Sequence, residues 1–201
     1  MNWLVLALLL AVPVVVVALV LRREAAARRR RMEVWRTFAQ QRGWRWIEAS
    51  GPWYRRRSSA VEGAIEGVEV RIDTYAVRHG KSSVTYTRAT AKLLRRVHAE
   101  LEATWRNLFT WMGEKFGRHS ISTGGGEFDQ MMFVRSDSQG FARTVLDDDA
   151  RARILEIGRH PDVRIEGDLA RISWHGAEKD PVVLEAAARA VAALVRACAR
   201  V

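Results

Sequence analysis

Residues 60–73 read AVEGAIEGVEVRID, and this stretch decides the class of fold. Over residues 68–73 apolar and charged residues alternate strictly, which predicts a strand with one buried face. Residues 60–65 predict another strand, which ends before Gly67. After a turn at residues 79–81, valine, threonine and tyrosine residues predict the returning strand of a hairpin. The middle of the chain is therefore expected to form antiparallel sheet.

The C-terminal third predicts a second hairpin between two capped helices. Residues 163–174 alternate around a Gly-Asp turn, as in a tight hairpin. Three successive aspartates from Asp147 precede a helical stretch over residues 150–157, where carboxylates complement the helix dipole. Asp180 followed by Pro181 is typical of the start of a helix. That terminal helix has an apolar stripe at spacings of three and four, formed by Leu184, Ala187, Val191, Leu194 and Cys198.

Residues 93–116 fit two patterns. Apolar residues recur at spacings of three or four along the segment, as in one long helix, but its first part also alternates as in a strand. We expect a strand to about Glu102 and then a helix from Trp105 to Phe116. Together the elements predict an α+β domain over residues 44–201, with a mostly antiparallel sheet and helices packed on one face. That length suffices for a hydrophobic core.

Residues 3–21 read WLVLALLLAVPVVVVALVL and contain no charge. As a helix of about 1.5 Å per residue they would extend roughly 28 Å, close to the hydrocarbon core of a bilayer, which is roughly 30 Å thick. A cleaved signal peptide is the alternative, but it carries its basic residues before a shorter apolar run. Here only Met1 and Asn2 precede the run. We therefore predict an uncleaved transmembrane anchor over residues 1–21.

Arginines follow this run, and positive charge beside a span stays on the cytoplasmic side. We expect a single-pass protein of a bacterial inner membrane, with the N-terminus outside and the C-terminal domain in the cytoplasm. Residues 22–43 predict a basic juxtamembrane helix that ends at Gly43. The residues expected at the membrane interface are Arg22, Arg23, Arg28, Arg29, Arg30, Arg31 and Trp35. Core positions near the membrane are the alternative for Trp35 and the tryptophans after it.

The formal net charge of +10 is unevenly distributed. Residues 22–57 hold twelve arginines and three glutamates, so nine of the excess charges lie beside the predicted span. Anionic lipid head groups are the expected partner, at about 1 kcal/mol per basic residue near the surface. No nucleic-acid partner is expected, because the rest of the chain is nearly neutral. Cys198 is the one cysteine, which excludes an intrachain disulfide and fits a reducing compartment. Its place on an apolar stripe predicts a buried thiol.

Several short motifs occur together with the span: Tyr86-Thr87-Arg88, Ile121-Ser122-Thr123-Gly124, Phe128-Asp129 and Phe133-Val134. With them the chain resembles a group of bacterial proteins of no known activity, each with a single membrane anchor and a cytoplasmic α+β domain. In that group a Thr-Gly-Asp turn precedes a Phe-Asp pair and an apolar strand. This chain departs from the pattern at Gly125, where the acid would fall. The resemblance implies the anchor and the layout of the fold, and no activity.

The motifs indicate no catalytic residue, cofactor or metal site. The glycine-rich stretch over residues 122–126 lacks the lysine of a phosphate-binding loop, so a turn is expected. Asp129 is expected to hydrogen-bond nearby backbone, although a contact with a ligand is the alternative. The five histidines lack the spacing of a zinc site. The candidate partner or ligand contacts are Arg55, Arg56, Arg57 and Asp129, and a solvated loop is the alternative for the arginines.

Two classes of function fit these observations. The first is a membrane-anchored interaction or assembly module, which binds a protein partner or a second copy of itself. The second is a membrane-tethered enzyme, such as a hydrolase, whose site assembles from residues far apart in the sequence. A pocket with convergent polar groups would favour the enzyme. A shallow surface with an apolar patch would favour the interaction module.

Overall fold

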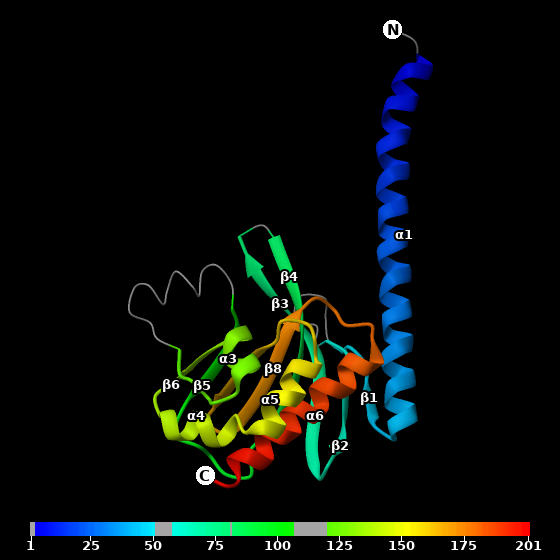
Figure 1. The fold of residues 1–201 in the computed structure, drawn as a ribbon. Helices are drawn as coiled ribbons and strands as arrows, with labels where there is room; N and C mark the ends of the chain where they lie inside the picture. The colour runs from blue at the N-terminus through cyan, green and yellow to red at the C-terminus, as the bar shows by residue number, and fades with distance from the viewer. Residues whose placement is uncertain (1–2, 51–57, 81, 107–119) are drawn as a thin grey trace.

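The computed structural model describes residues 3–50, 58–80, 82–106 and 120–201 (Figure 1). The side chains of residues 3–14, 17, 21, 24, 28 and 79 also lie outside the described set. The predicted contacts Arg55, Arg56 and Arg57 and most of the helix expected over residues 105–116 fall outside the described residues. Those predictions therefore stay predictions.

Within the described residues, eight antiparallel strands form one sheet in the order β1-β2-β3-β4-β8-β7-β5-β6. The strands are β1 (Arg45–Ile47), β2 (Ala60–Ile65), β3 (Val68–His79), β4 (Ser82–Lys92), β5 (Leu101–Trp105), β6 (Met132–Ser136), β7 (Asp162–Glu166) and β8 (Leu169–His175). Both predicted hairpins are present, as β3–β4 and β7–β8. They meet in the sheet because β8 pairs with β4, with Ile172 opposite Ala89.

Helices pack on one face of the sheet, so the predicted α+β class is confirmed (Figure 1). They are α1 (Trp3–Arg42), α3 (Gly126–Met131), α4 (Gln139–Val145), α5 (Asp148–Glu156) and α6 (Pro181–Cys198). The predicted caps are also confirmed. Asp180 accepts a hydrogen bond of 2.9 Å from the backbone N–H of Val182, and Asp147 accepts one of 2.8 Å from that of Ala150. All five residues of the predicted α6 stripe are buried against the sheet, where they form the centre of the core.

The structure corrects the prediction for residues 93–105. The strand β5 begins only at Leu101, and Trp105 is its last residue rather than the start of a helix. Residues 93–100 are not part of a strand, because backbone N–H groups in this segment donate to carbonyls of the β7–β8 turn instead. The N–H groups of Leu93 and Val97 donate to the carbonyls of Asp168 and Gly167, each at 2.8 Å.

The first helix, α1, runs for 40 residues and ends where Gly43 adopts a left-handed conformation (φ 66°). Its C-terminal end packs against β1, β2 and α6, while the rest projects away from the domain (Figure 1). Within the part of the chain that the structure describes, no helix combines the length and the apolar character needed to cross a membrane. Most side chains of the predicted span, residues 3–21, lie outside that part.

Candidate functional site

The last turns of α1 belong to the core of the domain. Trp35, Phe38 and Ala39 are 2%, 4% and 1% exposed. Phe38 also meets the ring of Trp44 edge to face, with 5.5 Å between ring centroids. The packed unit therefore begins before residue 44, where the sequence placed its start. The structure places Trp35 in the core, which is the alternative that the sequence left open, and not at a membrane interface.

Glu178 joins α1 to the domain through hydrogen bonds in both directions. Its backbone carbonyl accepts from the indole Nε1 of Trp35 at 2.9 Å, and its own N–H donates to Thr87 Oγ1 at 2.9 Å. Its carboxylate accepts from the indole of Trp174 at 3.1 Å and from the backbone N–H groups of Lys179 and Asp180 at 2.8 and 3.0 Å. Glu178, in the loop before α6, thus connects α1, β4 and β8. We call this set the junction.

The junction also sets the protonation of the Glu178 carboxyl group. Burial alone would raise its pKa, but the donors outweigh burial and lower the pKa below the usual range. The backbone N–H groups of Lys179 and Asp180 contribute most, followed by Trp174 and Arg159. Because every one of these donors favours the charged form, the carboxylate is held ionised at neutral pH.

The arginines of α1 divide into two groups. Arg22, Arg23, Arg29 and Arg30 are exposed on the part of the helix that projects from the domain. Arg36 and Arg42 instead pair with acids of the domain, Glu48 and Glu185, at the C-terminal end. The predicted membrane-interface residues Arg22, Arg23, Arg29 and Arg30 therefore lie on the projecting part of α1, whereas Arg31 is half-buried.

The sheet face opposite the helices carries a row of polar side chains, one from each strand. In order along the sheet the row is Arg45, Glu62, Arg71, Thr90, Arg171, Arg164, Glu102 and Arg135, and each residue is the direct cross-strand partner of the next. We call it the charged row. Five of its members are arginines and two are glutamates, so the row has an excess of positive charge.

Ion pairs compensate the two ends of the charged row but not its centre. Glu62 pairs with Arg45 and Arg71, and Glu102 accepts from Arg164 at 2.7 Å. Arg171 lies directly opposite Arg164, although like charges in that position destabilise a sheet. Among the described residues Arg171 has no hydrogen bond and no ion pair. The centre of the row therefore presents a guanidinium group that is open to a partner.

Asp162 lies on the same face beside this centre, opposite Ser173. Its Oδ1 is buried, with no hydrogen-bond partner among the described residues. Burial, and then the nearby Glu102 carboxylate, raise the pKa of Asp162, against the lowering effect of Arg164 and Arg171. A buried polar atom without a partner is uncommon in native proteins, which marks this position as a polar site.

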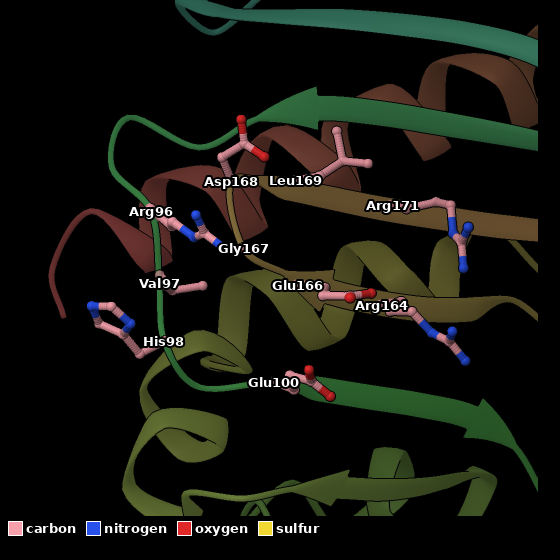
Figure 2. Close-up of a pocket in the computed structure, with 10 residues that line it drawn as sticks. All are labelled: Arg96, Val97, His98, Glu100, Arg164, Glu166, Gly167, Asp168, Leu169 and Arg171. Carbon is pink, nitrogen blue, oxygen red and sulfur yellow. The ribbon is translucent and has the colours of Figure 1, made fainter.

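A hollow of about 510 Å³ adjoins the centre of the row (Figure 2). Three basic and three acidic side chains line it: Arg96, Arg164, Arg171, Glu100, Glu166 and Asp168. Figure 2 shows Arg164 and Arg171 on neighbouring strands, with their guanidinium groups extending to the same side and the helices behind the sheet. Two further hollows, of about 450 and 530 Å³, lie along the same row on either side. The surface is thus long, shallow and charged.

Asp129 has a local structural role. Its carboxylate accepts from the hydroxyls of Ser122 and Thr123 at 2.8 and 2.7 Å, and from the backbone N–H groups of Thr123 and Gly124 at 3.1 Å. Burial opposes ionisation, but these donors outweigh it and lower the pKa of Asp129. The prediction that Asp129 hydrogen-bonds neighbouring backbone is confirmed. Its oxygens are occupied by the glycine-rich turn.

Two other predictions concern isolated side chains. Cys198 is 2% exposed, as its place on the stripe predicted, and burial raises the pKa of its thiol to about 12. Among the described residues no group of three histidine, cysteine or acidic side chains could hold a metal ion. His160 instead stacks on Trp105, with 4.5 Å between ring centroids.

Sequence patterns did not indicate the junction or the charged row. Glu178 lies in a loop before α6, where the sequence indicated only the helix start at Asp180 and Pro181. Each member of the charged row is an ordinary polar residue on the exposed side of its own strand. Direct neighbours in the row lie up to 81 residues apart in the sequence, as Thr90 and Arg171 do, so the row exists only once the sheet order is known.

No protein-family model matches the chain, and no curated protein matches it either. Among solved structures, the fold is similar to the crystal structure of the mycobacterial trehalose monomycolate transport factor A, TtfA. The TM-score is 0.53 and the sequences are 12% identical over 83% of this chain and 93% of that chain. At that identity the similarity shows a common fold. The resemblance to a group of membrane-anchored bacterial proteins stays a prediction.

Proposed function

We propose that the chain is a membrane-anchored docking module. Residues 3–21 span the bacterial inner membrane with the N-terminus outside, and the α+β domain lies in the cytoplasm. The arginines after the span contact anionic head groups. The charged row on the sheet binds an acidic segment of a protein partner near the membrane.

The observation that carries this proposal is the junction. A flexible linker would let an anchored domain sample all directions, and an enzyme acting on a diffusing substrate needs no more than that. Here Trp35 is buried and bonded to Glu178, and α1 continues without a break from there toward residue 3. The direction of the domain relative to the helix is thus constrained. That constraint favours recognition of a partner with a defined position relative to the membrane.

Sequence and exposure support the membrane part of the proposal. The run over residues 3–21 has the length of a span, and arginines flank it on one side only. At its C-terminal end the side chains of Val15, Val16, Leu19 and Val20 are 50–54% exposed, on the part of α1 that projects away from the domain (Figure 1). A bilayer would cover them.

The like-charge contact supports the docking part. Arg164 and Arg171 face each other at the centre of the sheet, where like charges cost stability, and Glu102 compensates Arg164 but not Arg171. A carboxylate from a partner would pair with both guanidinium groups, in a geometry for which arginine is well suited. The structural neighbour TtfA is a transport factor, which is compatible with an accessory docking role of this kind.

The membrane part is tested by extraction and by a reporter. The full chain is expected to stay with membranes after alkaline carbonate washing, and removal of residues 1–21 is expected to release it. A reporter fused after Val201 that works only in the periplasm is expected to be inactive. Release of the intact chain, or strong periplasmic activity, would contradict the anchor and its orientation.

The docking part is tested by site-specific photocrosslinking in cells that express the full chain. The crosslinker replaces Thr90 on the charged row or, as a control, Ala152, which is exposed on α5. We expect a discrete adduct from position 90 alone. Arg171→Glu should abolish it, whereas Arg189→Glu, at an exposed position of α6, should not. An adduct of twice the mass identifies the partner as a second copy of the chain. Equal labelling at both positions would contradict docking on the charged row.

A further inference from the structure

The outer part of the β3–β4 hairpin projects beyond the sheet as a two-stranded ribbon. The neighbour β2 stops pairing with β3 at Asp73, and β8 stops pairing with β4 at Tyr86. From Ala76 to Thr85 the two strands have only each other in the sheet, and the exposed side chains of Ala76, Arg78, Ser83 and Thr85 lie on one face of this ribbon. An isolated two-stranded ribbon is only marginally stable in water. Its projection therefore calls for a surface against which it lies.

The ribbon points toward the same end of the molecule as the N-terminal half of α1 (Figure 1). The junction provides a common reference level for the two. Trp35 on α1 bonds to Glu178, Glu178 bonds to Thr87, and Thr87 pairs with Thr74 across the hairpin. From this level, the distance toward that end of the molecule can be counted along α1 and along the hairpin.

The two distances agree. From Trp35 back to Arg22 the helix takes thirteen residue steps, or about 20 Å at 1.5 Å per residue. From Thr74 to Gly80 at the hairpin tip the strand takes six steps, or about 20 Å at roughly 3.3 Å per residue. The tip therefore reaches the level of Arg22, which is the first residue after the predicted span.

The charge of the ribbon suits an anionic surface. Residues 74–99 contain no acidic residue, and the tip reads Arg78-His79-Gly80-Lys81. Arg78 is exposed, and none of the described residues pairs with it. Lys81 lies outside the described residues, so Arg78 is the described cation of the tip.

We propose that the tip of the β3–β4 hairpin is a second membrane contact, in which Arg78 meets the phosphates of anionic lipid head groups beside the span. This inference rests on the proposed function, because it needs the anchor in place. With two contacts, α1 and the ribbon, the domain can neither tilt nor swing freely. The charged row is then held at one angle to the bilayer.

The test measures how close the tip lies to the head groups in the full chain. Ser83→Cys near the tip and Leu94→Cys at the opposite end of β4 each carry a fluorophore, since both native side chains are exposed. The native thiol of Cys198 is buried and stays unlabelled. Each labelled protein is reconstituted into anionic bilayers that contain a lipid with a quencher on its head group.

We expect quenching at position 83 and little at position 94. Arg78→Glu should reduce quenching at position 83 roughly twofold at low salt, where charge interactions are screened least. Arg95→Glu is the matched control, an exposed arginine beyond the far end of β4, and should leave it unchanged. Equal quenching at both positions overturns the inference, as does quenching that Arg78→Glu leaves unaltered. If carbonate releases the chain from the bilayer, the anchor itself is absent and the proposed function fails with it.

Discussion

The indole of Trp35 and the backbone carbonyl of Glu178 lie 143 residues apart in sequence and share a buried hydrogen bond of 2.9 Å. Trp35→Phe keeps most of the packing but leaves that carbonyl without its donor, which should cost about 1–3 kcal/mol. Trp35→Ala also removes the ring and should cost about 3–5 kcal/mol. Thermal unfolding of the full chain in detergent, followed by near-ultraviolet circular dichroism, measures both. Equal losses for the two variants would show that the hydrogen bond contributes nothing.

The start of the folded unit is testable by truncation. A chain that begins at residue 30 keeps the three buried side chains of α1, whereas one that begins at residue 44 loses them. The shorter chain should be less stable by at least about 5 kcal/mol, because a tryptophan and a phenylalanine leave the core. Urea unfolding of the two chains makes the comparison. Equal midpoints would place the end of α1 outside the cooperative unit.

Stability should depend on pH through Glu178. Its pKa is lower in the folded chain than in the unfolded chain, so folding favours the ionised form. The resulting stabilisation is complete above the ordinary glutamate pKa and is lost as pH falls through the lowered value. Glu178→Gln should therefore be less stable than the native chain at pH 7, and the difference should shrink toward pH 3. A constant difference across this range would contradict the assignment. The pKa values of other carboxyl groups, such as Glu62 and Asp129, are also lowered in the folded chain. Part of the pH dependence of stability is therefore common to both proteins.

Two adjacent glycines should respond differently to a methyl group. A Cβ at Gly125 would lie 2.4 Å from Nε of Arg151, which is fixed by hydrogen bonds to the carbonyls of Thr123 and Leu146. Gly125→Ala should destabilise the chain by about 1–3 kcal/mol. A Cβ at Gly126 meets nothing within 4 Å and lies in α3, so Gly126→Ala should be neutral or slightly stabilising. Thermal unfolding measures the stability of the two variants. A larger loss of stability for Gly126→Ala than for Gly125→Ala would contradict the close packing of Gly125 against Arg151.

The thiol of Cys198 should report global unfolding. It is buried and its pKa is raised to about 12, so little reactive thiolate is available in the native state. Iodoacetamide should modify the native chain very slowly and the unfolded chain at the rate of a free cysteine. Mass spectrometry along a urea gradient should give the same midpoint as circular dichroism. Fast modification without denaturant would mean that the end of α6 opens locally.

Local patterns were sufficient for most of the elements. The β3–β4 hairpin follows from alternation on both sides of Gly80, and α6 follows from Asp180-Pro181 and its apolar stripe. Residues 93–105 were harder, because their contacts are made by a distant turn that a local pattern does not contain. For the same reason the sequence left Trp35 open between a membrane interface and the core, since its partner Glu178 comes from the other end of the chain.

The candidate site was less predictable than the fold. The charged row needs the order of all eight strands, and long-range pairing is not encoded in the period of any one strand. Gly125 offers a smaller example. The chain has a glycine there in place of the expected acid, and the structure puts that position against the Arg151 guanidinium group. An acid at this position would have a cation beside it, which only the folded turn reveals.

The unbroken course of α1 makes the orientation of the domain a matter of helical phase. An α-helix turns by about 100° and rises about 1.5 Å for each residue. One residue inserted between Arg22 and Arg30 would therefore rotate everything before it by more than a quarter turn relative to the domain. Seven inserted residues would nearly restore the original azimuth, at a separation about 10 Å greater. The number of residues between the apolar run and Trp35 therefore sets the direction that the charged row faces in the plane of a bilayer.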